Sequence, residues 1–319
     1  RGNIKTKTDG KSNITNYRYD SENRLVAVIN AIGETTSYTY DKNGNMLSQT
    51  DGNGNVTRYE YGEANRLIKK IYPKVEGQTD EEREESYTYT QDGLIETKTD
   101  RNKNITSYRY DVFDRLIEEN AGGQIKSYTY DNNGNLLTMT DETGTTIREY
   151  DEENRVVSKT VPVIGTTRYE YDIYAGNGYI SEKTTDPKSN VTEKTYDKIG
   201  RLYSVKNDGK ETMYSYYTNG NRRSIMYPDG TRQSYTFYKD NRVKTLENTK
   251  SGGAILESYS YVYDQAGNQV LKIETTSTKQ REETRYEYDR LNRLEKVIEA
   301  NRVTSYSYDR AGNRKTQIV

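Results

Sequence analysis

The chain has 319 residues, 33 of them tyrosine, and it contains no histidine, cysteine or tryptophan. Without histidine and cysteine it has no Ser-His or Cys-His nucleophile system and no imidazole or thiolate metal ligands. Its formal net charge is -1 with both signs interspersed, so the sequence predicts no basic surface for nucleic acid or an anionic membrane. The sequence contains no run of about 18 apolar residues, the length needed to span a bilayer.

The residue types favour a folded β protein despite a mean hydropathy of -1.14. Disordered chains lack aromatic and β-branched residues, whereas Tyr, Val, Ile and Thr are frequent here. The chain opens with RGNIK, which contains neither an initiator methionine nor an apolar leader and reads as the middle of a repeat. We therefore interpret residues 1–319 as a fragment excised from a longer protein.

A strand, a tight turn and a second strand are predicted at SYTYDKNGNML, residues 37–47, and similar stretches follow at 127–137, 285–295 and 305–315. Because strand side chains alternate, Tyr38 and Tyr40 share a face. A short period along the whole chain predicts one array over residues 1–319 instead of separate domains. The second aromatic residue marks about 14 units, mostly 20 or 21 residues apart, at Tyr19, Tyr40, Tyr61, Tyr89, Tyr110, Tyr130, Tyr150, Tyr171, Tyr196, Tyr216, Phe237, Tyr263, Tyr288 and Tyr308.

The turn after each Tyr-Asp pair is predicted to need a residue with positive φ. Three positions after the aspartate slot stands Gly, Asn or Asp in 13 of the 14 units, and Ala175 in the other. A type I turn followed by a left-handed residue requires these types, and the aspartate can accept N–H groups of the turn. We assign no catalytic, cofactor-binding or metal residue, and we assign structural repeat positions to Tyr38, Tyr40, Asp41, Gly44, Tyr128, Tyr130, Asp131, Gly134, Tyr196, Asp197, Gly200, Arg201, Tyr286, Tyr288, Asp289, Tyr306, Tyr308, Asp309 and Gly312.

Successive turns alternate between two types, Asn-Arg and Gly-Asn, as in Asn23-Arg24 and Gly44-Asn45. The pairs Asp114-Arg115 and Gly200-Arg201 stand at the same turn position but match neither type. The true repeat is therefore a doublet of about 42 residues, present about seven times, in which neighbouring hairpins have different surroundings. Wider gaps come from four inserted segments, which we expect to lengthen loops: residues 72–86, 173–179, 247–258 and 274–284.

The stretch TYDKIGRLYSVKNDGKETMYSYY, residues 195–217, resembles the repeat of the YD-repeat or RHS-repeat family, and the resemblance covers essentially the whole chain. It implies an all-β fold in which antiparallel hairpins form a curved, spiralling sheet, part of a hollow β-shell. In polymorphic toxins and insecticidal toxin complexes such shells enclose a C-terminal toxic polypeptide, and in teneurins they carry adhesion modules. The Lys-, Asn- and Tyr-rich composition is similar to that of surface proteins of Gram-positive bacteria.

These features predict a non-enzymatic wall segment of a secreted or cell-surface bacterial protein, with its own C-terminal toxin or cargo polypeptide as partner. The alternative function is a carbohydrate-binding or adhesion module that stacks glycans on exposed tyrosines. The alternative fold is a seven-bladed β-propeller. We expect no cofactor, no nucleic-acid partner and no membrane insertion, and we expect weak head-to-tail self-association through the terminal strand edges.

Two other interpretations of the carboxylates, as a glycosidase pair and as calcium ligands, are less well supported than a role in capping turns. A glycosidase needs two specific carboxylates in a cleft, whereas most aspartates here recur in turn slots. The stretch DGNGN, residues 51–55, is similar to alternating calcium ligands, but Val56 stands where the EF-hand pattern requires glycine. We therefore expect no calcium site there.

Overall fold

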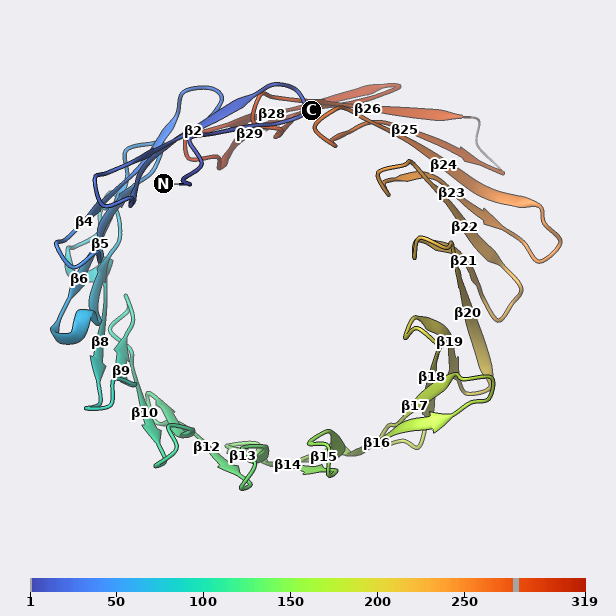
Figure 1. The fold of residues 1–319 in the computed structure, drawn as a ribbon, viewed down its shortest axis with the longest axis horizontal. Coiled ribbons are helices and arrows are strands. Elements are labelled where there is room, and N and C mark those ends of the chain that lie inside the picture. Colours follow the sequence, from blue (N-terminus) through green and yellow to red (C-terminus); the bar gives the residue numbers. More distant parts are fainter. Residues whose placement is uncertain (1, 278–280) are drawn as a thin grey trace. The chain divides into compact units, whose positions relative to one another are not determined.

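In the computed structural model, which describes residues 2–277 and 281–319, the chain forms 29 strands in one sheet and two short 3-10 helices (Figure 1). Neither helix, in the part of the chain that is described, has the length or the apolar character needed to cross a membrane. The fold is therefore all-β, and it is built from hairpins.

The strands are short, and consecutive strands are joined by turns in most cases. The first ten are β1 (Thr6–Thr8), β2 (Ile14–Tyr19), β3 (Leu25–Ile29), β4 (Thr35–Tyr40), β5 (Met46–Thr50), β6 (Val56–Tyr61), β7 (Leu67–Ile71), β8 (Glu84–Tyr89), β9 (Ile95–Thr99) and β10 (Ile105–Tyr110). The helices are η1 (Glu63–Asn65) and η2 (Glu81–Arg83).

The remaining strands continue the same pattern. They are β11 (Leu116–Ala121), β12 (Gln124–Tyr130), β13 (Leu136–Asp141), β14 (Gly144–Tyr150), β15 (Val156–Val161), β16 (Gly165–Tyr174), β17 (Ile180–Thr185), β18 (Val191–Tyr196), β19 (Leu202–Asn207), β20 (Lys210–Tyr216), β21 (Arg222–Met226), β22 (Arg232–Phe237), β23 (Val243–Thr249), β24 (Ile255–Tyr263), β25 (Gln269–Thr276), β26 (Glu282–Tyr288), β27 (Leu294–Glu299), β28 (Arg302–Tyr308) and β29 (Arg314–Ile318).

Consecutive strands pair antiparallel, as in the register Ala27↔Ser37 between β3 and β4 and Ser37↔Thr50 between β4 and β5. The substantial contacts between strands in the described ranges are all between neighbours in the sequence. A propeller would instead divide the strands into separate four-stranded blades. The propeller alternative is therefore wrong, and the chain is a quasi-one-dimensional hairpin array.

Most Tyr-Asp pairs end a strand at a type I turn with a bulge. At residues 41–45, the Asp41 N–H donates to the Asn45 carbonyl at 2.9 Å and the Gly44 N–H donates to the Asp41 carbonyl at 3.2 Å. Gly44 has a φ of 91°, and the strand register shifts between Thr39 and Tyr40. A left-handed residue at this position lets the two strands continue with their natural twist.

The sheet has a tyrosine face that is half-buried and a second, polar face whose side chains range from exposed to buried. On the polar face hydroxyl groups pair across strands, as in Thr39 with Ser48 at 2.6 Å and Thr129 with Thr138 at 2.6 Å. Ile225 is the one buried hydrophobic side chain among the described residues. Strand pairing and polar contacts between hairpins must therefore supply stability that a packed core gives other proteins.

Three of the four inserted segments lengthen strands, which corrects the expectation that they lengthen loops. The segment 247–258 extends β23 and β24, which pair as far as Thr249↔Ile255. The segment 274–284 continues β25 and begins β26, and its residues 278–280 lie outside the described residues. Added residues on both sides of a hairpin pair with each other, which satisfies their backbone groups. The segment 72–86 does form a loop, which contains η2.

The segment 173–179 also overturns the turn assignment at Ala175. Strand β16 runs on to Tyr174, which pairs with Ile180, so the turn falls at residues 175–179. Positive φ occurs at Asp172, with 54°, and at the residues 176–178. Ala175 itself is outside the left-handed region, because the bulge has moved to Asp172 within the longer strand.

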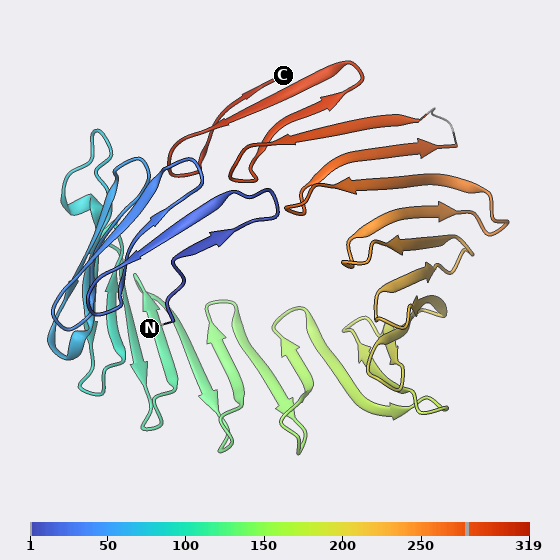
Figure 2. The same cartoon turned by 45° about the horizontal axis from the view of Figure 1, so that its top comes forward.

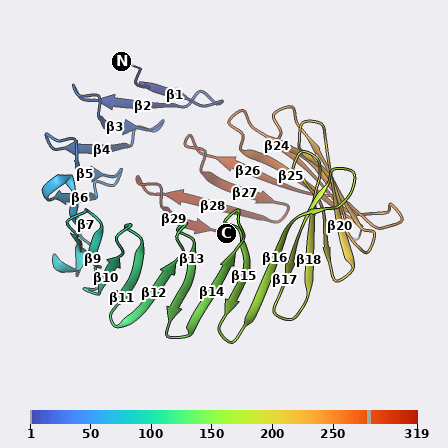
Figure 3. The same ribbon diagram turned by 60° about the horizontal axis from the view of Figure 1, so that its bottom comes forward.

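The chain divides into two compact units. The first contains residues 1–108, 262–272 and 282–319, and its N-terminal and C-terminal hairpins are the blue and red strands of Figure 2. The second contains residues 109–261 and 273–281, and Figure 3 shows its hairpins from β11 to β18 following one another in chain order.

Candidate functional site

The YD turn, defined as the turn that follows the second aromatic residue of each unit, is organised in most units by an aspartate. Asp41 Oδ1 accepts the backbone N–H groups of Asn43 at 2.9 Å and Asn45 at 2.8 Å, and Oδ2 accepts the Asn45 amide at 2.8 Å. The Asn45 side chain is the main cause that lowers the pKa of Asp41. A carboxylate with three such donors is a turn cap and stays ionised at neutral pH. The same two backbone bonds occur at Asp20, Asp111, Asp131, Asp151, Asp197, Asp264, Asp289 and Asp309.

Asparagines join neighbouring YD turns in one direction. Asn65, which has a φ of 57°, accepts amide hydrogens from Asn43 at 3.1 Å and Asn45 at 2.8 Å on its Oδ1. The Asn-Arg turn is therefore bonded to the Gly-Asn turn that precedes it. The same pair of bonds reaches Asn154 from Asn133 and Asn135, and Asn241 from Asn219 and Asn221.

The arginine of the Asn-Arg turn reaches in the opposite direction. Arg24 Nε donates to Asp20 Oδ2 at 2.7 Å, and its Nη1 donates to the Asp41 carbonyl of the next turn at 2.8 Å. Its guanidinium also lies 5.0 Å from the centre of the Tyr40 ring, which is a cation–π distance. Equivalent stacks join Arg66 to Tyr89, Arg115 to Tyr130, Arg155 to Tyr171, Arg201 to Tyr216 and Arg293 to Tyr308.

These two contacts explain the alternation of turn types. Each turn accepts bonds from the turn before it and donates to the turn after it, but the two types use different groups. An Asn-Arg turn accepts on its asparagine side chain and donates from its arginine, whereas a Gly-Asn turn accepts on a backbone carbonyl and donates from its asparagines. Two hairpins therefore make one complete set of contacts. Sequence reasoning missed these roles, although the alternation of turn types was the signal.

The substitution Asn154→Gly tests the asparagine contact. Glycine keeps the positive φ of 61° but removes the acceptor of two hydrogen bonds. We expect it to lower the free energy of unfolding by about 1 kcal/mol more than Asp114→Gly does, as measured by urea denaturation. Asp114 has a φ of 62°, so the control carries the same glycine entropy. Equal losses for the two variants would contradict the role of Asn154.

The second tyrosine of most units bonds to the previous hairpin through its hydroxyl. Tyr40 donates to the Leu25 carbonyl at 2.7 Å and Tyr130 donates to the Leu116 carbonyl at 2.8 Å. Tyr196 differs, because it donates to Glu182 Oε2 at 3.2 Å. Further bonds of the first kind are made by Tyr19, Tyr61, Tyr89, Tyr150, Tyr171, Tyr216, Tyr288 and Tyr308.

Alkaline pH should destabilise the array. Burial raises the pKa of Tyr40 and Tyr288, and burial together with the Glu85 carboxylate raises the pKa of Tyr87 to about 12. A raised folded-state pKa gives stability that is fully present below the unfolded value of about 10 and is lost as pH rises toward 12. We expect circular dichroism to show the urea midpoint falling in this window. A midpoint that stays constant to about pH 12 would contradict this expectation.

The assigned repeat positions lie along the turn edge and do not converge on one cavity. The first tyrosine of a pair faces a cross-strand neighbour, as in Tyr38↔Gln49, Tyr128↔Met139, Tyr286↔Val297 and Tyr306↔Gln317. The glycines at 44, 134, 200 and 312 have φ values from 79° to 92°. This distribution is that of a repeated structural element.

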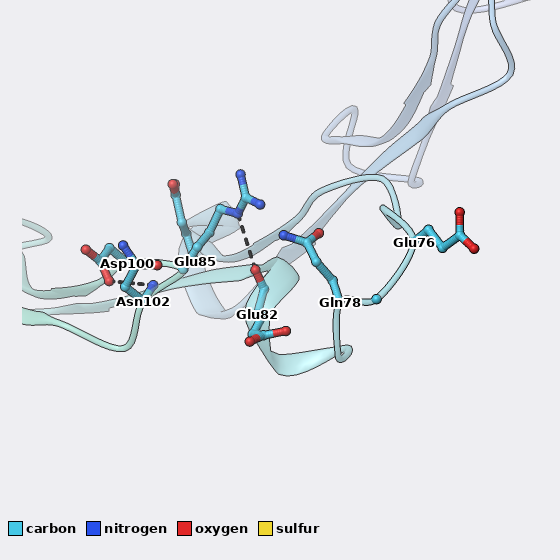
Figure 4. A pocket seen from close by; sticks show the side chains of 8 residues that line it. Glu76, Gln78, Glu82, Glu85, Asp100 and Asn102 are labelled. Atoms are coloured by element: carbon cyan, nitrogen blue, oxygen red, sulfur yellow. Dashed lines mark hydrogen bonds between the residues drawn. The ribbon is translucent and has the colours of Figure 1, made fainter.

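A cavity of about 650 Å³ lies beside the inserted loop 72–86 (Figure 4). Figure 4 shows its labelled carboxylates spread apart and not directed at a common point. Arg101 Nε donates to the Glu82 carbonyl at 3.3 Å, and Glu85 accepts the hydroxyls of Tyr72 at 3.1 Å and Tyr87 at 3.0 Å. Glu85 is therefore engaged by two tyrosine hydroxyls of its own hairpins, which fits a structural role for this carboxylate. The lining includes Glu76, Gln78, Glu82, Glu85, Asp100, Arg101 and Asn102.

The stretch 51–55 is a turn whose aspartate is occupied by internal donors. Asp51 Oδ1 accepts the N–H groups of Asn53 at 2.9 Å and Asn55 at 2.8 Å, and Oδ2 accepts the Asn55 amide at 2.9 Å. Oxygen atoms that face donors are poorly placed to coordinate calcium. Within the described residues, no group of three acidic side chains could hold a metal ion.

The stacked hairpins and their bonded turns define a repeat protein with a structural role. A family model described as Teneurin YD-shell matches residues 2–118 and 78–268. These ranges together cover most of the chain, so the chain belongs to the YD-shell family, and its role is that of a structural shell component.

Solved structures share the fold at low sequence identity. The crystal structure of TcdB2-TccC3 matches with a TM-score of 0.62 and 15% identity over 97% of this chain and 22% of that chain. The Photorhabdus luminescens Tc holotoxin pore gives a TM-score of 0.56 and 16% identity over 97% and 21%, and TcdB2-TccC3 without its hypervariable C-terminal region gives 0.54 and 15% over 97% and 21%. The chain thus spans about a fifth of the length of these chains. No curated protein matches it.

Proposed function

We propose that this chain is part of the wall of a secreted or cell-surface bacterial YD-repeat protein, in which the wall encloses or presents a C-terminal toxin polypeptide. The observation that carries the proposal is the use of the turn groups. Asp41, Arg24 and Asn65 bond one hairpin to the next, so these side chains serve the array and not a substrate.

The structural relatives support a cargo. One of them is described as lacking a hypervariable C-terminal region, which means that the related chain otherwise carries one. A regular wall followed by a variable segment fits a container whose contents change. The glycan alternative is less favoured, because guanidinium groups already lie over the rings of Tyr40 and Tyr130 on which a sugar would stack.

Limited proteolysis of the full-length natural protein tests the proposal. We expect its C-terminal polypeptide to survive at least about tenfold longer within the intact protein than as an isolated polypeptide, because the wall excludes the protease. Adding urea to unfold the wall should remove the difference. Equal digestion rates without urea would contradict enclosure. Turnover of a glycan or peptide by residues 1–319, abolished by one carboxylate substitution, would contradict the non-enzymatic role.

A further inference from the structure

Two turns of the first unit contact YD turns that are far away in the sequence. We call the turn at the other end of a hairpin from a YD turn the opposite turn. The opposite turn 9–13 lies beside the YD turn 264–268, and the opposite turn 51–55 lies beside the YD turn 309–313 (Figure 2). All four turns belong to the first compact unit.

A glycine stands at the point of closest approach in both contacts. A Cβ atom on Gly10 would lie 1.8 Å from the Gln265 carbonyl oxygen, and one on Gly52 would lie 2.0 Å from the Arg310 carbonyl oxygen. Neither glycine has a φ in the left-handed region, so the backbone conformation does not require glycine there. Glycine is needed because the partner carbonyl occupies the place of a side chain.

Polar bonds surround each of these glycines. Asn53 Nδ2 donates to Asp309 Oδ2 at 3.0 Å, and the Arg310 N–H donates to Asn53 Oδ1 at 3.0 Å. At the other contact, Lys11 pairs with Asp264 at 3.5 Å, and Asn292 Nδ2 of the neighbouring YD turn 289–293 donates to Asp9 Oδ2 at 2.9 Å. The two contacts therefore combine a carbonyl packed on glycine with an amide-to-carboxylate bond.

The across-turn amides also help to keep these carboxylates charged. The Asn313 side chain and then the Asn53 side chain are the largest causes that lower the pKa of Asp309 to about 2. The Asn13 and Asn292 side chains are the largest causes that lower the pKa of Asp9. Both contacts therefore hold an ionised acceptor at neutral pH.

We propose that an opposite turn that opens with Asp-Gly is a docking seat for a YD turn, and that the seats at Gly10 and Gly52 hold the YD turns 264–268 and 309–313 against the opposite turns 9–13 and 51–55. This inference rests on the wall function and adds how the wall joins hairpins that are distant in sequence.

The mark of a seat is glycine directly after the aspartate that opens the turn, whereas in the opposite turns with Asp208-Gly209 and Asp229-Gly230 the glycine has a positive φ and contacts no YD turn. The opposite turns 100–104 and 186–190 have the same aspartate cap, but Arg101 and Pro187 occupy the glycine position.

Glycine variants test the steric part of the seat. Residues 1–319 carry no cysteine, so nitroxide labels can be placed at Ile14→Cys and Ile318→Cys, two exposed positions of the first unit. We expect the double variant Gly10→Ala and Gly52→Ala to broaden the label-to-label distance distribution severalfold. The control Gly252→Ala lies in another opposite turn, has no atom within 4 Å of a Cβ and has no left-handed φ, and it should change nothing.

Asparagine variants test the polar part without adding an atom. Asn53→Ala removes both across-turn bonds, whereas Asn102→Ala changes the matching residue of the turn 100–104, where the backbone N–H makes the bond to Asp100. We expect the Arg310 amide to exchange hydrogen about fivefold to tenfold faster in Asn53→Ala than in Asn102→Ala. Exchange in residues 127–160 should stay unchanged and report that the array is folded.

The two readouts separate the seat from the wall function. Unchanged distances in the glycine double variant, or equal exchange of Arg310 in Asn53→Ala and Asn102→Ala, would overturn the seat. Neither result would affect protection of a C-terminal polypeptide by the wall, which is measured by proteolysis of the full-length protein. Conversely, loss of that protection would leave a confirmed seat in place.

Discussion

Replacing Gly134 with valine should lower the free energy of unfolding by about 1–3 kcal/mol, because a β-branched residue reaches positive φ only with strain. Gly134 has a φ of 89°, and no atom lies within 4 Å of the place of its Cβ. The Cβ itself therefore meets no neighbour, and the loss mainly reports backbone conformation. Urea denaturation of the purified chain, with the midpoint and slope fitted separately, measures it.

The matched control is Asn132→Val, two residues earlier in the same turn. Asn132 is exposed and has a negative φ, so valine should change stability there by at most about 0.5 kcal/mol. Losses of equal size at the two positions would show that the left-handed conformation of Gly134 is not what the turn depends on.

Arg115→Ala is expected to be about as damaging, with a loss of about 1–3 kcal/mol, because the arginine makes charge-assisted bonds in two turns. It contacts Asp111 at 2.7 Å and donates to the Asp131 carbonyl at 2.9 Å. Its guanidinium also lies 4.8 Å from the centre of the Tyr130 ring. Alanine would leave the Asp111 carboxylate without its cation and would uncover the ring.

Arg109→Ala serves as the control for Arg115→Ala. The Arg109 side chain is 69% exposed and pairs with Glu118 at 3.3 Å, so its loss should cost about 0–1 kcal/mol. Both variants remove one positive charge, and the difference between their urea midpoints isolates the contacts between turns. If Arg109→Ala proved as destabilising as Arg115→Ala, the stacking of arginine on the next hairpin would not be a source of stability.

Local chemistry made the hairpin turns predictable. Asp41 and Gly44 act within five residues of each other, so residue types alone indicate the cap and the left-handed position. The contacts between turns were not predictable in the same way. Asn65 meets Asn45 across 20 residues of chain, and only the register of two hairpins brings their side chains together.

Strand lengths and contacts between distant residues could not be predicted from the sequence for a related reason. The residues 173–174 extend β16 only because Tyr174 finds Ile180 opposite it, which depends on the whole hairpin. The contact of Asn53 with Arg310 joins residues 257 positions apart, and a single chain gives no covariation that would link them. Gly10 and Gly52 were visible in sequence, but a glycine alone does not say what approaches it.

The asparagine of an Asn-Arg turn contacts the preceding turn, whereas its arginine contacts the following turn. The contacts therefore have a direction along the chain and require the two turn types to alternate. A Gly-Asn hairpin must be followed by an asparagine hairpin, since the amides that the first donates need the side-chain oxygen that the second supplies. Deleting one hairpin would place two Gly-Asn turns side by side, and the amides of a residue such as Asn45 would lose their acceptor. Gene duplication and loss should therefore conserve an even count, so that such walls lengthen and shorten two hairpins at a time.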